Sequence, residues 1–129
     1  MTPQEKIAAQ MHGHPAMAGV QVLALHGSRA RGDGGAASDW DFAVLTDGST
    51  DLVGLSTALT IVLGTDAVDL VDLRRASALL RYRAARDGVV LVERGAGAFR
   101  EFQLEAVQFW CDAGPVIRAA QDDVLAALG

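Results

Sequence analysis

The chain has 129 residues, of which 50% are hydrophobic, 5% are aromatic and only one is cysteine, and its formal net charge is −5. We therefore expect a single domain over residues 1–129, with a core built from small aliphatic side chains. The acidic balance argues against a sequence-independent nucleic-acid binder, so no direct nucleic-acid binding is expected. The single cysteine, and the lack of a long apolar run or signal-peptide pattern, predict a cytoplasmic protein with no membrane contact.

The apolar pattern and the turn residues predict strands and helices in alternation. A short helix at residues 3–10, capped by Thr2, precedes a buried strand at residues 20–26. A helical turn at residues 28–31 leads into a glycine-rich loop and a second strand at residues 40–45. The elements expected after the second strand are a helix at 51–63, a strand at 67–73, a helix at 77–85 and a strand at 89–92.

The remainder of the chain is predicted to be helical. An apolar stripe at helical spacing begins with Phe99 and Phe102, and Gly114 with Pro115 predicts a break before a final helix at residues 116–128. The alternation of strands with helices favours an α/β fold, in which a small mixed β-sheet is packed with helices and followed by C-terminal helices.

The loop between the first two strands carries the strongest chemical pattern. Gly27 and Ser28 follow an apolar strand, and Asp39 and Asp41 open the next one. Side chains alternate along a strand, so the two carboxylates point to the same face, where they repel unless a divalent cation is bound. A Gly-Ser turn with free backbone N–H groups is suited to polyphosphate. Together these features predict chemistry on a magnesium nucleotide.

A pair of catalytic metal ions needs a third carboxylate from a neighbouring strand. The candidates are Asp66, Asp69 and Asp72. Asp69 stands in the middle of an apolar strand, where a buried charge costs several kcal/mol unless it meets a cation or hydrogen-bond donors. We therefore choose Asp69, with Asp72 as the fallback, and interpret Asp66 as a turn residue.

The spacing of these residues resembles a known family. Gly27-Ser28, ten residues, then Asp39-Trp40-Asp41 is similar to the Gly-Ser-x10-Asp-x-Asp signature of the nucleotidyltransferase superfamily that includes DNA polymerase beta. The short length and the Gly-Ser-Arg-Ala-Arg-Gly segment resemble the minimal nucleotidyltransferase (MNT) branch. Val-Asp-Leu-Val-Asp-Leu at residues 68–73 also resembles the MNT antitoxins that accompany HEPN toxins. The resemblance implies a polymerase beta-like nucleotidyltransferase fold.

The resemblance also implies roles for single residues. Asp39, Asp41 and Asp69 would be catalytic and would hold magnesium, with two ions expected. The nucleotide-binding positions that it implies are Gly27, Ser28, Arg31 and Ser38. His26 stands where the family often has an aromatic or apolar residue, and we expect it to pack under the loop. Arg29 is expected at the surface.

Related antitoxins transfer AMP from ATP to a tyrosine hydroxyl of the partner toxin, which blocks its RNase activity. The resemblance therefore implies a magnesium-dependent adenylyltransferase with ATP as substrate and a HEPN-type toxin as partner. HEPN ribonucleases share an Arg-x4–6-His motif, but every histidine here precedes the first arginine, Arg29, so the toxin must be a separate protein. Two alternatives stay open: an antitoxin that neutralises by binding without catalysis, and an adenylyltransferase that modifies a small molecule such as an antibiotic.

Overall fold

The computed structural model describes residues 1–35 and 37–128. Within these residues the strands form one four-stranded sheet in the order β3-β2-β1-β4. The strands are β1 (Val20–His26), β2 (Trp40–Thr46), β3 (Val68–Asp72) and β4 (Val89–Glu93). β1 pairs antiparallel with both β2 and β4, whereas β2 and β3 are parallel. The mixed sheet that the sequence predicts is confirmed.

The helices begin and end where the local sequence provides capping residues. The Thr2 hydroxyl accepts a hydrogen bond from Glu5 N–H, and Asp51 and Ser77 cap their helices in the same way. The helices are α1 (Pro3–Met11), the 3-10 turn η1 (Pro15–Met17), α2 (Gly27–Arg31), α3 (Leu52–Leu63), α4 (Ala78–Asp87) and α5 (Ala98–Leu128). Up to β4, the bounds of the predicted elements differ from these by no more than two residues.

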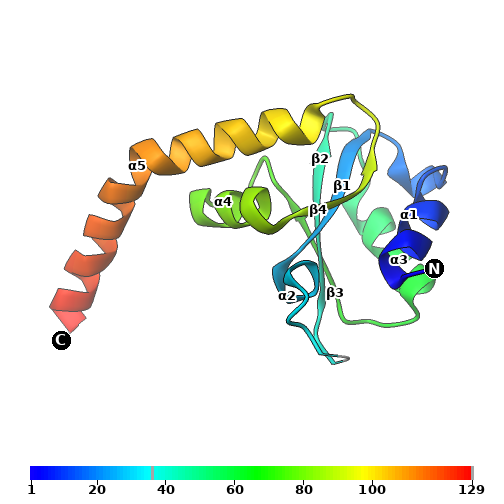
Figure 1. The fold of residues 1–129 in the computed structure, drawn as a ribbon, viewed down its shortest axis with the longest axis horizontal. Helices are drawn as coiled ribbons and strands as arrows, with labels where there is room; N and C mark the ends of the chain where they lie inside the picture. Colours follow the sequence, from blue (N-terminus) through cyan, green and yellow to red (C-terminus); the bar gives the residue numbers. More distant parts are fainter. Residues whose placement is uncertain (36, 129) are drawn as a thin grey trace.

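Helices cover both faces of the sheet (Figure 1). Because side chains alternate along β1, Leu23 and Leu25 face α1 and α3, while Val22 and Ala24 face α4 and the start of α5. The first face packs large aliphatic side chains around Phe42. The second face carries several alanines, so α4 and α5 lie close to the strands.

The prediction of a break at Gly114 and Pro115 is wrong, because α5 is one helix of 31 residues that contains Pro115. A proline inside a helix lacks the N–H that would bond the carbonyl four residues earlier, here that of Cys111. Both residues are exposed, so water can satisfy the free carbonyl. The expected result is a bend instead of a break, and Figure 1 shows α5 changing direction along its length. Its second half projects from the body of the molecule.

None of the helices in residues 1–35 and 37–128 combines the length and the apolar composition needed to cross a membrane.

Candidate active site

The sheet brings the predicted acids to one end of one face. Asp41 on β2 pairs in register with Asp69 on β3 and with His26 on β1. Residues paired in register share a face, and Asp39, just before β2, is close enough to raise the pKa of Asp41. Ala43, two residues beyond Asp41, packs in the cluster under α4 and α5. The acids therefore lie on the α4 side of the sheet, at its end.

Asp41 is half-buried, and several charged neighbours shift its pKa. Burial raises the pKa of Asp41 above its ordinary value, and the neighbouring carboxylates of Asp69 and Asp39 raise it further. His26 and Arg31 act in the opposite direction and lower the pKa of Asp41. His26 is itself buried. A carboxylate crowded by two others is a place where a bound cation would be stabilising.

The acids are not assembled into a closed cage. In the part of the chain that the structure describes, no group of three or more His, Cys, Asp or Glu side chains is arranged to hold a metal ion. Asp69 is exposed, so the argument that burial would demand a cation at Asp69 is wrong. The reason is strand order, because β3 is an edge strand of the sheet, and Asp69 is exposed while its neighbours Val68 and Leu70 are partly buried.

Gly27 allows the turn after β1 to lie against the acid pair. Its φ of 72° lies in the left-handed region that favours glycine. A Cβ built on Gly27 would overlap Oδ2 of Asp41. The turn leads directly into α2, which ends at Gly32 in a left-handed conformation. The local sequence thus brings the Gly-Ser turn and Asp41 into contact, as the motif predicts.

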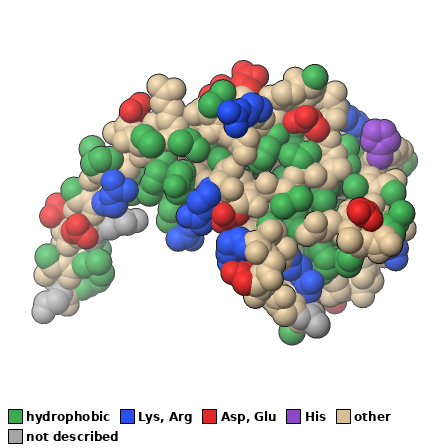
Figure 2. Space-filling view, in the orientation of Figure 1, with side chains coloured by type: hydrophobic (Ala, Val, Ile, Leu, Met, Phe, Trp, Pro, Cys, Tyr) green, Lys and Arg blue, Asp and Glu red, His purple; other side chains and the backbone are tan. Residues whose placement is uncertain are grey.

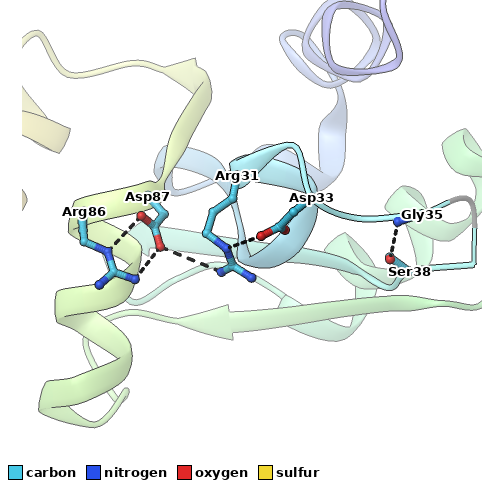
Figure 3. A network of polar contacts seen from close by, with 6 residues as sticks. All are labelled: Arg31, Asp33, Gly35, Ser38, Arg86 and Asp87. Atoms are coloured by element: carbon cyan, nitrogen blue, oxygen red, sulfur yellow. Dashed lines mark hydrogen bonds and ion pairs between the residues drawn. The ribbon is translucent and has the colours of Figure 1, made fainter.

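The loop that follows α2 brings two predicted nucleotide-binding hydroxyls together. A Cβ on Gly34 would lie 3.0 Å from Oγ of Ser28 and 3.2 Å from Oγ of Ser38, so both hydroxyls converge on this glycine. Ser38 Oγ accepts a hydrogen bond of 2.9 Å from Gly35 N–H (Figure 3). The hydroxyls of Ser28 and Ser38, ten positions apart in the sequence, therefore lie close together beside Gly34.

Arg29 has a structural role that the sequence did not predict. Its guanidinium donates two hydrogen bonds to the Ser38 carbonyl, at 3.0 and 2.8 Å, and stacks over the Trp40 ring at 4.0 Å. It is part-buried, so the expectation of a simple surface residue is wrong. These contacts tie α2 to the start of β2, and the only signal for them in the sequence is an aromatic residue between the two aspartates.

Arg31, a predicted phosphate-contacting residue, belongs to a chain of ion pairs that links α2 to the end of α4 (Figure 3). Its Nε lies 3.3 Å from Asp33 Oδ2, and its Nη1 lies 3.9 Å from Asp87 Oδ2. Asp87 also accepts two hydrogen bonds from Arg86, at 2.9 and 2.8 Å. Hydrogen bonds from Arg86, together with the charges of Arg86, Arg31 and Arg83, hold the pKa of Asp87 below its ordinary value. The sequence does not predict this role of Asp87, because Arg31 lies on another element.

Comparisons with known proteins show which family the chain belongs to. The family model described as "Polymerase beta, Nucleotidyltransferase" matches residues 5–96. The curated protein adenylyltransferase MntA of Aphanizomenon flos-aquae is 38% identical over 96 residues, which cover 65% of this chain. The match spans 64% of the length of that relative.

Solved structures match over nearly the whole chain. A crystal structure of a toxin–antitoxin with AMP-PNP has a TM-score of 0.74 and 27% identity, and the match covers 96% of this chain and 99% of that one. A tri-AMPylated Shewanella oneidensis HEPN toxin in complex with an MNT antitoxin has a TM-score of 0.71 and 26% identity, with 95% of each chain covered. Because the family model covers most of its residues, the chain belongs to the polymerase beta nucleotidyltransferase family.

Proposed function

We propose that the chain is a magnesium-dependent nucleotidyltransferase that moves AMP from ATP to a tyrosine hydroxyl of a HEPN-type ribonuclease toxin, and so acts as its antitoxin. The observation that carries the proposal is the in-register pair of Asp41 and Asp69, with Asp39 beside it and Gly27 against it. The name of the curated relative and the AMPylated toxin in a similar complex support it.

The three aspartates fit magnesium by their chemistry. Carboxylate oxygens are the ligands that this hard cation prefers, and the crowding around Asp41 is relieved by positive charge. Asp39 and Asp41 would hold both ions, and Asp69 would hold the ion near the attacking hydroxyl. Bound ions would neutralise the triphosphate and help to deprotonate the hydroxyl. Because the carboxylates share a face without forming a cage, we expect them to close only when the metal nucleotide arrives.

The turn and loop residues would bind the phosphates. The hydroxyls of Ser28 and Ser38 converge beside Gly34, and Arg31 lies close enough to lower the pKa of Asp41. In the reaction the tyrosine oxygen would attack the α-phosphorus and lose its proton to solvent, while the bond from the α-phosphorus to the α,β-bridging oxygen would break and pyrophosphate would leave toward the turn and Arg31. These residues contribute position and charge, which is most of what phosphoryl transfer requires.

We further propose that residues 1–129 form a single minimal domain, since both apolar clusters pack on one sheet. A domain of this size has little room for a separate acceptor-binding lobe. The partner protein would therefore complete the acceptor site. A cytoplasmic location and the absence of direct nucleic-acid binding stay predictions.

The test is to mix the purified chain with ATP, magnesium and the protein encoded next to it, and to follow the mass of that protein. We expect mass additions of AMP and a parallel loss of RNase activity. The Asp39→Asn, Asp41→Asn double variant should abolish both. If that variant still neutralises the toxin, binding without catalysis is the correct function. If no protein gains mass while ATP still binds, the transfer proposal is wrong.

A further inference from the structure

The second half of α5 exposes an apolar surface that the rest of the molecule does not cover. We call residues 112–128 the α5 arm. Val124 and Leu128 are 59% and 80% exposed, and Ile117, Ala120, Val124 and Leu125 line an apolar groove of about 600 Å³. Figure 2 shows hydrophobic side chains along the projecting helix, on the side that faces the hollow between helix and body. A surface of this kind marks a binding site.

The spacing of the apolar residues indicates that the occupant is elongated. Ile117 and Val124 are seven residues apart, and Ala113, Ala120 and Ala127 lie between and beyond them on the same stripe. Such a stripe is typical of a helix that packs along another helix, and alanines on it permit close approach. The arm is about 25 Å long at the usual rise per residue, so it can follow a partner helix for several turns.

The charges beside the stripe indicate what kind of partner fits. The arm carries Asp112, Asp122 and Asp123 but only one basic residue, Arg118, and the whole chain has a net charge of −5. A second copy of the chain would place acidic surface against acidic surface, which is unfavourable. A ribonuclease contacts RNA phosphates and therefore presents lysine and arginine. Charge complementarity thus favours a basic ribonuclease over a second copy.

We infer that the α5 arm is the docking element for the partner toxin, with its apolar stripe in an apolar groove of the toxin that has a basic rim. This inference rests on the proposed function. α5 lies on the α4 side of the sheet, the side that Asp41 faces, so a toxin held by the arm is on the side of the acids (Figure 1). Docking there raises the local concentration of the acceptor hydroxyl.

The test places charges in the groove without touching the proposed catalytic residues. The Val124→Glu, Leu125→Glu double variant should bind the toxin at least about tenfold more weakly, because two carboxylates must be desolvated in an apolar contact. The KM for toxin in AMP transfer should rise, whereas kcat and the affinity for ATP should not change. The melting temperature should stay the same, because both side chains are exposed.

The matched control is Val53→Glu with Ile61→Glu, which places two charges at apolar positions of α3 that are 79% and 75% exposed. This control should bind the toxin as the parent chain does. Equal toxin affinity for the arm variant and the parent would overturn the inference. So would a parent chain that light scattering shows to be a dimer and the arm variant to be a monomer, with toxin binding unaltered.

The Asp39→Asn, Asp41→Asn double variant separates this inference from the proposed function. It should bind the toxin with parental affinity while transferring no AMP. If the parent chain binds the toxin through the arm but transfers no AMP, the catalytic proposal fails and the docking inference stands. If AMP transfer proceeds with an unchanged KM for toxin in the arm variant, the docking inference fails and the catalytic proposal stands.

Discussion

At the scale of single residues, the surroundings of Asp41 oppose its ionisation. Burial raises its pKa above the ordinary 3.8, and Asp69 and Asp39 add to the effect. The folded state therefore holds this proton more tightly than the unfolded state does. The contribution is favourable below the ordinary pKa and is lost as the pH rises through the raised value. At neutral pH the ionised carboxylate thus destabilises the metal-free protein.

Asp41→Asn removes that charge with little change in shape. We expect the metal-free variant to melt at a higher temperature than the parent at pH 7, and the difference to vanish below about pH 3.8, where the parent side chain is protonated. Thermal unfolding across this pH range measures the effect. Magnesium with ATP should stabilise the parent but not the variant. A lower melting temperature for the variant at pH 7 would contradict the proposed repulsion.

The site requires glycine at position 27, because of the backbone conformation there and the close approach of Asp41. In Gly27→Ala, the φ of 72° costs about 1–2 kcal/mol, and the added Cβ overlaps Oδ2 of Asp41. We expect a lower melting temperature and a loss of AMP transfer of about a hundredfold, since a displacement near 1 Å can have such an effect. Thermal unfolding and AMP-transfer rates measure the two effects.

Gly32→Ala is the matched control for Gly27→Ala. Its φ is 81°, but nothing lies within 4 Å of the position that its Cβ would occupy. It should therefore lose similar stability and retain most of the activity. Equal losses of activity in the two variants would show that backbone strain, not the contact with Asp41, is responsible.

At the scale of elements, Asp87 connects α4 to α2 and holds Arg31 beside the acids. Asp87→Asn should free Arg31 and Arg86 from their shared carboxylate and leave Arg31 less well positioned for the phosphates. We expect the KM for ATP to rise about two- to fivefold with kcat less affected, because a partly exposed ion pair at 3.9 Å is worth up to about 1 kcal/mol. Steady-state kinetics with varied ATP measure this split.

The control for Asp87→Asn removes the other partner of Arg31. Asp33 is more exposed than Asp87, with 62% of its side chain accessible against 16%, so its pair with Arg31 is screened by water. Asp33→Asn should change the KM for ATP much less. If the two variants behave alike, Asp87 has no special part in positioning Arg31.

The elements up to β4 were predictable because their signals are local. Apolar runs mark the strands, and Thr2, Asp51 and Ser77 mark helix starts through hydrogen bonds to backbone groups of the same helix. Pro115 was misread because its effect depends on the Cys111 carbonyl being open to water, and the sequence does not state exposure. A break and a bend therefore have the same sequence pattern.

The residues of the candidate site could be proposed from the sequence, but their exposure and their contacts with other elements could not. Period-two alternation predicts Asp39 and Asp41 on one face, and the structure pairs Asp41 in register with Asp69. The exposure of Asp69 follows from the edge position of β3, which depends on how the strands are ordered. The ion pair between Asp87 and Arg31 joins separate helices, and no local pattern encodes such a contact.

At the scale of the whole molecule, the first part of α5 contributes to stability, and its second part is the proposed surface for partner binding. The apolar cluster beneath α4 includes Phe99, Phe102 and Ala106 of this helix and none of its later residues. Trp110 adds a ring stack on Tyr82, and beyond it the helix projects from the body. The first part of α5 thus completes the core, while the arm contributes surface.

Removing residues 113–128 should therefore leave the folded body intact. We expect the shortened chain to keep its melting temperature within about 2 °C, because no side chain of either apolar cluster is removed. It should bind ATP with magnesium as the parent does, since the predicted nucleotide residues lie before β4. Thermal unfolding and calorimetric titration measure both properties. A shortened chain that unfolds would show that the projecting helix supports the core, and the separation along α5 would then be wrong.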